Sequence, residues 1–143
     1  MTMEGCSARQ VSWLPWIRDI IEIHNETWGL SLGIVDLLSN STACFVAIER
    51  GKRVRGYCFV EEDRNRGFFE LQDIAVAPGF RGQGVGRELM QAAMEACSRI
   101  KLMTRVGRPQ GVVFFERLGF EREQYVENYY EIGDDALRMC WTR

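Results

Sequence analysis

The chain has 143 residues, of which 46% are hydrophobic and 27% charged, and its formal net charge is −2. This composition is typical of one globular domain over residues 1–143 that buries its own core without metal or disulfide staples. The slight negative charge argues against nucleic acid as a partner, since wrapping nucleic acid needs a basic face, and no segment approaches the ~20 apolar residues of a membrane span.

The first third of the chain predicts a short strand followed by two helices. The strand is expected at residues 9–12, and apolar residues then recur at helical spacing over residues 14–28. Gly29 is placed to end this helix, and Ser31 to cap a second, short helix over residues 32–39.

Three strands are predicted next. Residues 43–49 and 53–61 are strand-like, and the intervening Arg50-Gly51-Lys52 has the length and the glycine of a hairpin turn, so these two strands should pair antiparallel. A turn at residues 63–67 leads into a third strand at residues 68–76.

The second half of the chain alternates between helices and strands. Val85, Leu89, Ala93 and Ala96 form one apolar helical stripe directly after a glycine-rich segment. The pattern then predicts a strand at 100–106, a helix at 109–118 and an antiparallel pair at 120–126 and 136–141.

The glycine-rich segment, residues 81–86, reads Arg-Gly-Gln-Gly-Val-Gly between a strand and a helix. The amides at a helix N-terminus bind phosphate, and glycines let the backbone approach an anion closely. Arg81 and Arg87 can add charge-assisted contacts. Glycines that serve only packing are the alternative. The segment lacks the Gly-Lys-Ser/Thr of a Walker loop, and the antiparallel strands before it differ from a dinucleotide-binding fold.

Residues 73–86, Asp-Ile-Ala-Val-Ala-Pro-Gly-Phe-Arg-Gly-Gln-Gly-Val-Gly, resemble the acetyl-coenzyme A motif of the Gcn5-related N-acetyltransferase (GNAT) superfamily. Residues 111–120, Gly-Val-Val-Phe-Phe-Glu-Arg-Leu-Gly-Phe, resemble its later helix–turn–strand motif. The resemblance implies an α+β fold with a mixed, mostly antiparallel sheet of about seven strands, about four helices and a splayed acetyl-CoA cleft. It also implies an acetyl-CoA-dependent N-acetyltransferase.

The resemblance also implies where acetyl-CoA binds. Main-chain groups of the strand at 68–76 should pair with the pantetheine arm, the amide near Ile74 should polarise the acetyl carbonyl, and the amides of residues 81–86 should hold the pyrophosphate. The residues expected at the cofactor are Ile74, Ala75, Val76, Arg81, Gly82, Gln83, Gly84, Val85, Gly86 and Phe115.

Residues 129–139 resemble the closing hairpin of protein N-terminal acetyltransferases, including the ribosomal-protein alanine type. This implies a protein or peptide N-terminal amine as acceptor, contacted by Tyr129 and Tyr130, with Trp28 lining the substrate cleft. The two tyrosines covering a sheet edge is the alternative. Alternative functions are acetylation of a small-molecule or lysine amine, and a non-catalytic acetyl-CoA-binding module.

The catalytic groups depart from the ribosomal-protein type. That type would have a catalytic glutamate where this chain has Met103, an asparagine at Arg108 and a tyrosine acid at Phe115. Glu70 matches the glutamate base of the histone-acetylating branch and is the predicted base, with a solvated strand carboxylate as the alternative. Tyr129 is the predicted replacement for the acid, with Tyr125 as the other candidate.

Three groups of residues have simpler expected roles. His24 is expected to pack or hydrogen-bond in the core. Asp73, three residues after Glu70, should face the opposite side of a regular strand unless a bulge intervenes, and is expected to be structural. The five cysteines form no CxxC pair, which indicates mostly buried, reduced thiols and a cytoplasmic protein. The sequence has no cluster of metal-ligating residues, so no metal is expected. A homodimer is considered by analogy with the superfamily.

Overall fold

The computed structural model describes residues 7–29, 33–49 and 53–143. In this part of the chain a single seven-stranded sheet has the order β1-β2-β3-β4-β5-β7-β6. The strands are β1 (Ser7–Val11), β2 (Ala43–Glu49), β3 (Arg53–Asp63), β4 (Phe68–Val76), β5 (Arg99–Arg105), β6 (Glu121–Glu131) and β7 (Asp134–Thr142). The helices are α1 (Ile17–Trp28), α2 (Ile34–Asn40), α3 (Val85–Ala96) and α4 (Pro109–Arg117), with 3-10 turns at Leu14–Trp16 and Pro78–Phe80.

The predicted α+β architecture is confirmed, because the one parallel contact, between β4 and β5, lies in an otherwise antiparallel sheet. Most element ends lie within about two residues of the predicted bounds, and two differences matter more. The first helix begins with a separate 3-10 turn, and β6 and β7 run further toward their hairpin than predicted. The predicted cap Ser31 and the turn at residues 50–52 lie outside the described residues.

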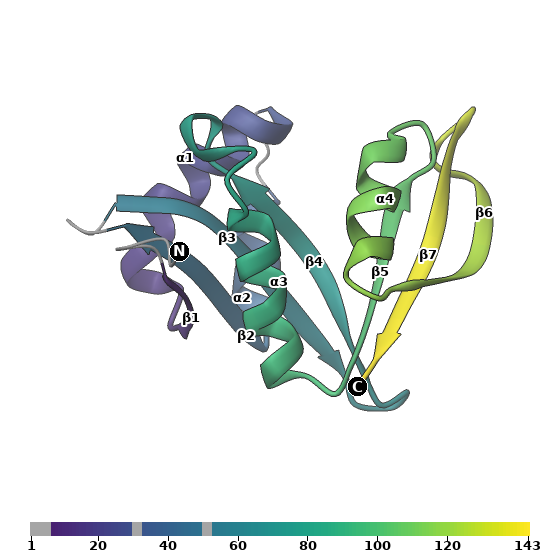
Figure 1. Cartoon of the computed structure of the whole chain (residues 1–143), viewed down its shortest axis with the longest axis horizontal. Helices are drawn as coiled ribbons and strands as arrows, with labels where there is room; N and C mark the ends of the chain where they lie inside the picture. Colours follow the sequence, from purple (N-terminus) through teal and green to yellow (C-terminus); the bar gives the residue numbers. More distant parts are fainter. Residues whose placement is uncertain (1–6, 30–32, 50–52) are drawn as a thin grey trace.

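Helices cover both faces of the sheet, so the core has two parts (Figure 1). On β3, Tyr57 and Phe59 point to the face packed by α1 and α2, whereas Cys58 and Val60 point to the face packed by α3 and α4. This alternation follows from the two-residue period of a strand. The α1–α2 helices cover the β1–β4 half of their face, which leaves that face of β5, β7 and β6 open.

The described cysteines are free thiols, and Cys44, Cys58 and Cys97 are buried as small core residues. Burial raises the pKa of Cys44 to about 12 and that of Cys97 to about 11. Cys6 lies outside the described residues. Among the helices of the described residues, none has the length and apolar character needed to cross a membrane.

The sheet opens between β4 and β5. These strands pair only at Phe69 with Ile100 and at Glu70 with Lys101. Directly afterwards β4 is bulged: Leu71 and Asp73 oppose consecutive residues of β3, so Gln72 is extra. Beyond the bulge, β5 continues its pairing with β7 as far as Arg105, and the two halves of the sheet diverge (Figure 1). The splayed sheet expected from the sequence is therefore present.

Candidate active site

The open edge of β4 carries main-chain groups that lack a strand partner. The amide of Ala77 donates to the carbonyl of Arg55 on β3. In an antiparallel ladder alternate residues point their N–H and C=O groups the same way, so the main-chain groups of Ala75 also point toward β3. The main-chain groups of Ile74 and Val76 then point toward the opening between β4 and β5. They are two of the three β4 residues predicted at the pantetheine arm, whereas Ala75 turns its backbone away from it.

The glycine segment forms the N-terminus of α3. Gly84 is the N-cap residue with φ of 83°, and no side chain caps this helix end. The first amides of a helix have no intrahelical acceptor, so these N–H groups remain available at the positive end of the helix dipole. A Cβ at Gly82 or Gly84 would meet no atom within 4 Å, so these glycines leave open space around the amides. These observations fit an anion site.

Gly86 has a packing role instead. A Cβ on Gly86 would lie 3.3 Å from the tip of the Phe114 ring of α4, a tight contact that would push the ring back by a few tenths of an ångström, so this glycine favours the close approach of α3 to that ring. Within one segment, therefore, Gly82 and Gly84 leave the space that a phosphate site needs, whereas Gly86 lies against a ring, and phosphate binding by the segment stays a prediction.

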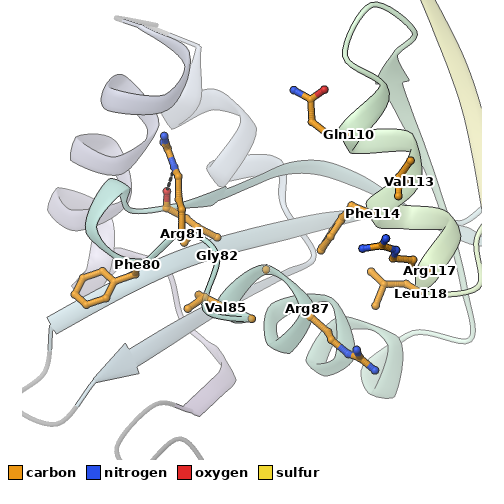
Figure 2. A pocket seen from close by; sticks show the side chains of 13 residues that line it. Phe80, Arg81, Gly82, Val85, Arg87, Gln110, Val113, Phe114, Arg117 and Leu118 are labelled. Atoms are coloured by element: carbon orange, nitrogen blue, oxygen red, sulfur yellow. Dashed lines mark hydrogen bonds between the residues drawn. The ribbon is translucent and has the colours of Figure 1, made fainter.

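A cavity of about 700 Å³ lies between the N-terminus of α3 and α4. Its α4 side is formed by Gln110, Val113, Phe114, Arg117 and Leu118, and Figure 2 shows Phe114 pointing across it toward α3. Phe115, predicted at the cofactor, lies elsewhere: it is 7% exposed and packs edge-to-face against Phe120. The core stripe of Val112 and Phe115 at helical spacing is a sequence signal for this arrangement.

The two arginines of the glycine segment differ in orientation. The guanidinium of Arg81 donates from Nε to the Val76 carbonyl at 3.1 Å (Figure 2). It also donates from an η nitrogen to Thr27 of α1 at 3.3 Å, so it ties the loop to β4 and α1. Arg87, one turn into α3, lines the cavity. Arg87 is therefore better placed than Arg81 to add a cation to a bound phosphate.

The bulge at Gln72 decides which face Glu70 and Asp73 share. Glu70 opposes Glu61 and Asp73 opposes Phe59, and two positions on β3 that differ by two residues face the same way. Both carboxylates therefore lie on the α1 side of the sheet. In a regular strand, residues three apart face opposite sides. The extra residue Gln72 reverses this for Glu70 and Asp73, so the expectation that they face opposite sides does not apply.

Glu70 lies where the open face begins. Its carboxylate is 3.6 Å from the guanidinium of Arg138 on β7, and its side chain is 30% exposed. Arg138 opposes Met103 on β5. The Glu70–Arg138 ion pair thus passes across β5 beside Met103, the position where the ribosomal-protein type would carry its glutamate.

Asp73 is the centre of a hydrogen-bond network. Its Oδ2 accepts from the Tyr57 hydroxyl at 2.6 Å and lies 2.8 Å from His24 Nδ1, and its Oδ1 accepts from Trp28 Nε1 at 3.0 Å. An ionised carboxylate only accepts, which assigns the proton to Nδ1 of His24. Because three donors occupy this carboxylate, Asp73 acts as a structural anchor, as expected for both Asp73 and His24.

The network also holds Trp28 at the opening of the sheet. The Trp28 side chain is 46% exposed, and the guanidinium of Arg108, the N-cap residue of α4, lies 5.7 Å from its ring centroid. A cation over an indole face is attracted to it. Trp28 and Arg108 therefore join the end of α1 to the start of α4 across the opening.

Replacing Asp73 with alanine should destabilise the fold by about 2–4 kcal/mol, because the fully buried Tyr57 hydroxyl and His24 Nδ1 would lose a charged acceptor. Urea unfolding followed by circular dichroism measures the loss. Asp36→Ala, at an exposed position of α2, is the control and should leave the midpoint nearly unchanged. An equal effect of both substitutions would contradict a stabilising role for the network.

The β6–β7 hairpin presents the two tyrosines predicted at the substrate. The ladder is interrupted between Val126 and Glu131, so the residues between them bulge out of the sheet. The rings of Tyr129 and Tyr130 pack edge-to-face with centroids 4.9 Å apart, and Arg105 of β5 lies 4.2 Å from the Tyr130 centroid. This places Tyr130 on the open face of the sheet, with Tyr129 beside it and 51% exposed.

Asp135 holds this bulge in shape. Its carboxylate accepts hydrogen bonds from the Tyr125 hydroxyl and from the amide of Asn128, which has φ of 53°. The hydrogen bond from Tyr125 is the main cause that lowers the pKa of Asp135, and the bond from the Asn128 amide adds to it. The Tyr125–Asp135 bond also raises the pKa of Tyr125. The Tyr125 side chain is exposed, as is that of Tyr129, but its hydroxyl is already bonded to Asp135, whereas no side-chain hydrogen bond is seen for the Tyr129 hydroxyl among the described residues.

Comparison with known proteins now decides the family. The family model described as an acetyltransferase (GNAT) domain matches residues 40–122, which is more than half of the chain. The chain belongs to the GNAT acetyltransferases. This acetyltransferase is 31% identical over 116 residues to a Bacillus subtilis protein provisionally named a ribosomal protein bS18-alanine N-acetyltransferase, a match covering 75% of this chain and 74% of that one.

Two further proteins are similar to this acetyltransferase. N-alpha-acetyltransferase 30 of Schizosaccharomyces pombe is 30% identical over 108 residues, covering 72% of this chain and 63% of that protein. The structure of Arabidopsis thaliana Naa50 in complex with the bisubstrate analogue CoA-Ac-MVNAL has a TM-score of 0.80 at 16% identity and covers 97% of this chain and 99% of that one. This last likeness concerns the fold.

The acetyltransferase therefore uses acetyl-CoA, and its residues fit that co-substrate. The uncapped amides at the N-terminus of α3 with Arg87 suit a pyrophosphate. The Ile74 main chain and the Val76 amide, on the β4 edge that lacks a strand partner, suit the amides of a pantetheine arm, whereas the Val76 carbonyl is bonded to Arg81. Bound acetyl-CoA supplies a thioester for attack by an amine. Among the described residues there is no group of three or more side chains that could hold a metal ion.

Proposed function

We propose that the acceptor of this N-acetyltransferase is the N-terminal amine of a protein or peptide. The observation that supports it most is the bulged hairpin, which offers Tyr129 and Tyr130 on the open face beside Arg105. Aromatic side chains with exposed hydroxyls are suited to packing on, and hydrogen bonding with, a peptide backbone. The names of the relatives, which refer to protein alanine and α-amine acetylation, point the same way.

Glu70 is the proposed general base. Its side chain lies on the same open face. Glu70 is the last β4 residue that pairs with β5, so it stands where the two strands separate. The neutral amine attacks the thioester carbonyl, and Glu70 takes the proton that the nitrogen must lose, directly or through a water, as the C–N bond forms and the C–S bond breaks to release the thiolate. About a tenth of an α-amine with a pKa near 8 is neutral at pH 7, against well below 0.1% of a lysine amine, so a modest base suits an α-amine.

The proposed proton donor to the leaving thiolate is Tyr129. Phe115 has no hydroxyl to donate and lies buried in the core. The Tyr129 side chain is 51% exposed and its ring packs edge-to-face against that of Tyr130, so it is accessible to a bound substrate. The cytoplasmic location and the homodimer considered from the sequence stay predictions.

Release of free CoA thiol, measured over a panel of amines, tests the acceptor. We expect turnover on peptides with a free N-terminus, and little on the same peptides blocked at the N-terminus but carrying a lysine, or on small amines. Tyr129→Ala should raise KM for the peptides by about tenfold, the effect expected of one packed aromatic contact. Tyr129→Phe should lower kcat instead, if the hydroxyl donates the proton.

Ile132→Ser, at the 95% exposed tip of the same hairpin, is the matched control and should leave both constants near those of the parent. Faster turnover of a small amine than of any peptide would contradict the proposed acceptor. Saturable acetyl-CoA binding without turnover on any amine would instead support a non-catalytic binding module.

A further inference from the structure

A second cavity, of about 500 Å³, lies on the open face of the sheet beyond Glu70. It extends over β4, β5, β7 and β6 on the side that α1 and α2 leave uncovered. The residues that line it are Arg66, Phe68, Arg99, Lys101, Glu123, Gln124 and Arg138. We call this cavity the basic groove, because four of its lining side chains are cationic and one is anionic.

The cations of the basic groove are only partly neutralised. Lys101 is paired with Glu123 at 2.8 Å and lies 4.9 Å from the centroid of the Phe68 ring. Arg99 has a buried Nε without a hydrogen-bond partner among the described residues. The Arg66 side chain is 75% exposed, and its Nε is 3.9 Å from Asp63, which is a weak pairing. The groove therefore retains donors and positive charge for an anionic ligand.

The basic groove adjoins the proposed acceptor site through Arg138. This side chain lines the groove and its guanidinium is also 3.6 Å from Glu70. Along β4, Glu70 and Phe68 lie about 13 and 20 Å from Ile74, at about 3.3 Å per residue. An extended peptide with its amine near Ile74 covers this span in about four to six residues.

We propose that the basic groove binds acidic side chains of the protein substrate, about four to six residues after the acetylated N-terminus. This inference rests on the proposed peptide acceptor and names its class: N-terminal segments that carry aspartate or glutamate at those positions. Guanidinium groups bind carboxylates through paired hydrogen bonds, and a cavity of this size holds one or two such side chains. The cationic lining of the groove complements acidic side chains, and the chain's net charge of −2 argues against nucleic acid as the occupant.

Two matched peptides test the proposal. They share their first three residues and an amidated C-terminus, and differ in carrying Asp and Glu, or Asn and Gln, at positions 4–6. At low ionic strength we expect KM to be about tenfold lower for the acidic peptide, corresponding to about 1.4 kcal/mol, with similar kcat. Added salt should reduce the difference, because screening weakens exposed ion pairs.

Two variants assign the effect to the groove. Arg99→Gln removes the cation whose buried Nε has no partner among the described residues. Arg66→Gln removes a second cation of the groove, at an exposed position where folding is not at risk. Each should reduce the preference to less than about threefold. Arg64→Gln, in the same turn but outside the groove and 86% exposed, should retain the full preference.

Anisotropy of the fluorescein-labelled acidic peptide separates this inference from the proposed function. If no peptide is acetylated but the acidic peptide binds with an affinity that depends on Arg99 and Arg66, the proposed function fails and the groove stands. Equal KM values and equal binding for the two peptides would overturn the groove while leaving peptide acetylation intact. A single-stranded oligonucleotide of equal charge that displaces the peptide at lower concentration would also overturn it.

Discussion

Replacing Gly84 with glutamate should lower the affinity for acetyl-CoA by about 100-fold. Gly84 is the N-cap of α3 beside the uncapped amides. A side chain there meets no atom within 4 Å, so the substitution adds charge without a clash, together with the backbone strain of a positive φ that the two further variants below share. Two like charges about 4 Å apart repel by about 4 kcal/mol at an effective dielectric of 20. Solvent screening at this exposed position brings the effect nearer the ~2.7 kcal/mol of a 100-fold change.

Calorimetric titration with acetyl-CoA measures this loss, and two further variants isolate its cause. Gly67→Glu places the same residue at another exposed glycine with positive φ, 73°, in the β3–β4 turn, and should leave acetyl-CoA affinity unchanged. Gly84→Asn keeps a residue that tolerates a positive φ but adds no charge, and should weaken binding far less than glutamate. Undiminished affinity of Gly84→Glu would place the pyrophosphate elsewhere.

Replacing Glu70 with glutamine should lower kcat by about 100-fold or more while leaving acetyl-CoA affinity unchanged. Removal of a general base typically costs 10²–10⁴-fold in rate, because the amide cannot accept the proton that the amine must lose. Glutamine keeps the size of the side chain, and Arg138, which loses its partner, is 23% exposed and can be hydrated. The fold should therefore survive the substitution.

Steady-state kinetics on the best peptide measures this effect, and calorimetry checks that acetyl-CoA binding persists. Glu62→Gln is the matched control, since Glu62 opposes Phe69 and so faces the other side of the sheet from Glu70. Its kcat should match that of the parent. A Glu70→Gln enzyme with the parent's kcat would assign the proton to another acceptor, and Glu70 would then be the solvated strand carboxylate considered as the alternative.

The features that could be predicted from the sequence are those formed by residues close together in the chain. The glycines at 82, 84 and 86, between an apolar strand and an amphipathic helix, predict an anion site because the positive φ of Gly84 and the uncapped amides of α3 arise within a few residues. The order of helices and strands follows in the same way from hydrophobic spacing and turn residues. The family resemblance carried by residues 73–86 and 111–120 added the cofactor.

The features that only the tertiary structure decided depend on register and on contacts between distant residues. One extra residue, Gln72, places Glu70 and Asp73 on the same face. No residue type in this strand predicts that a bulge occurs there. The bonds from Tyr57, His24 and Trp28 to Asp73 span 16 to 49 positions, and Tyr57 carries no sequence signal for this role. The basic groove joins four strands, whose side chains meet only after the sheet has formed.

The sequence by itself thus predicted where the acetyl donor binds, because the predicted site is made of consecutive backbone groups at one strand edge and one helix end. The tertiary structure decided which carboxylate accepts three hydrogen bonds, which aromatic of the Phe114–Phe115 pair faces the cavity, and where cations gather near Glu70. Backbone sites are encoded locally by conformational preference, whereas side-chain sites depend on pairing register and on the packing of elements far apart in the chain.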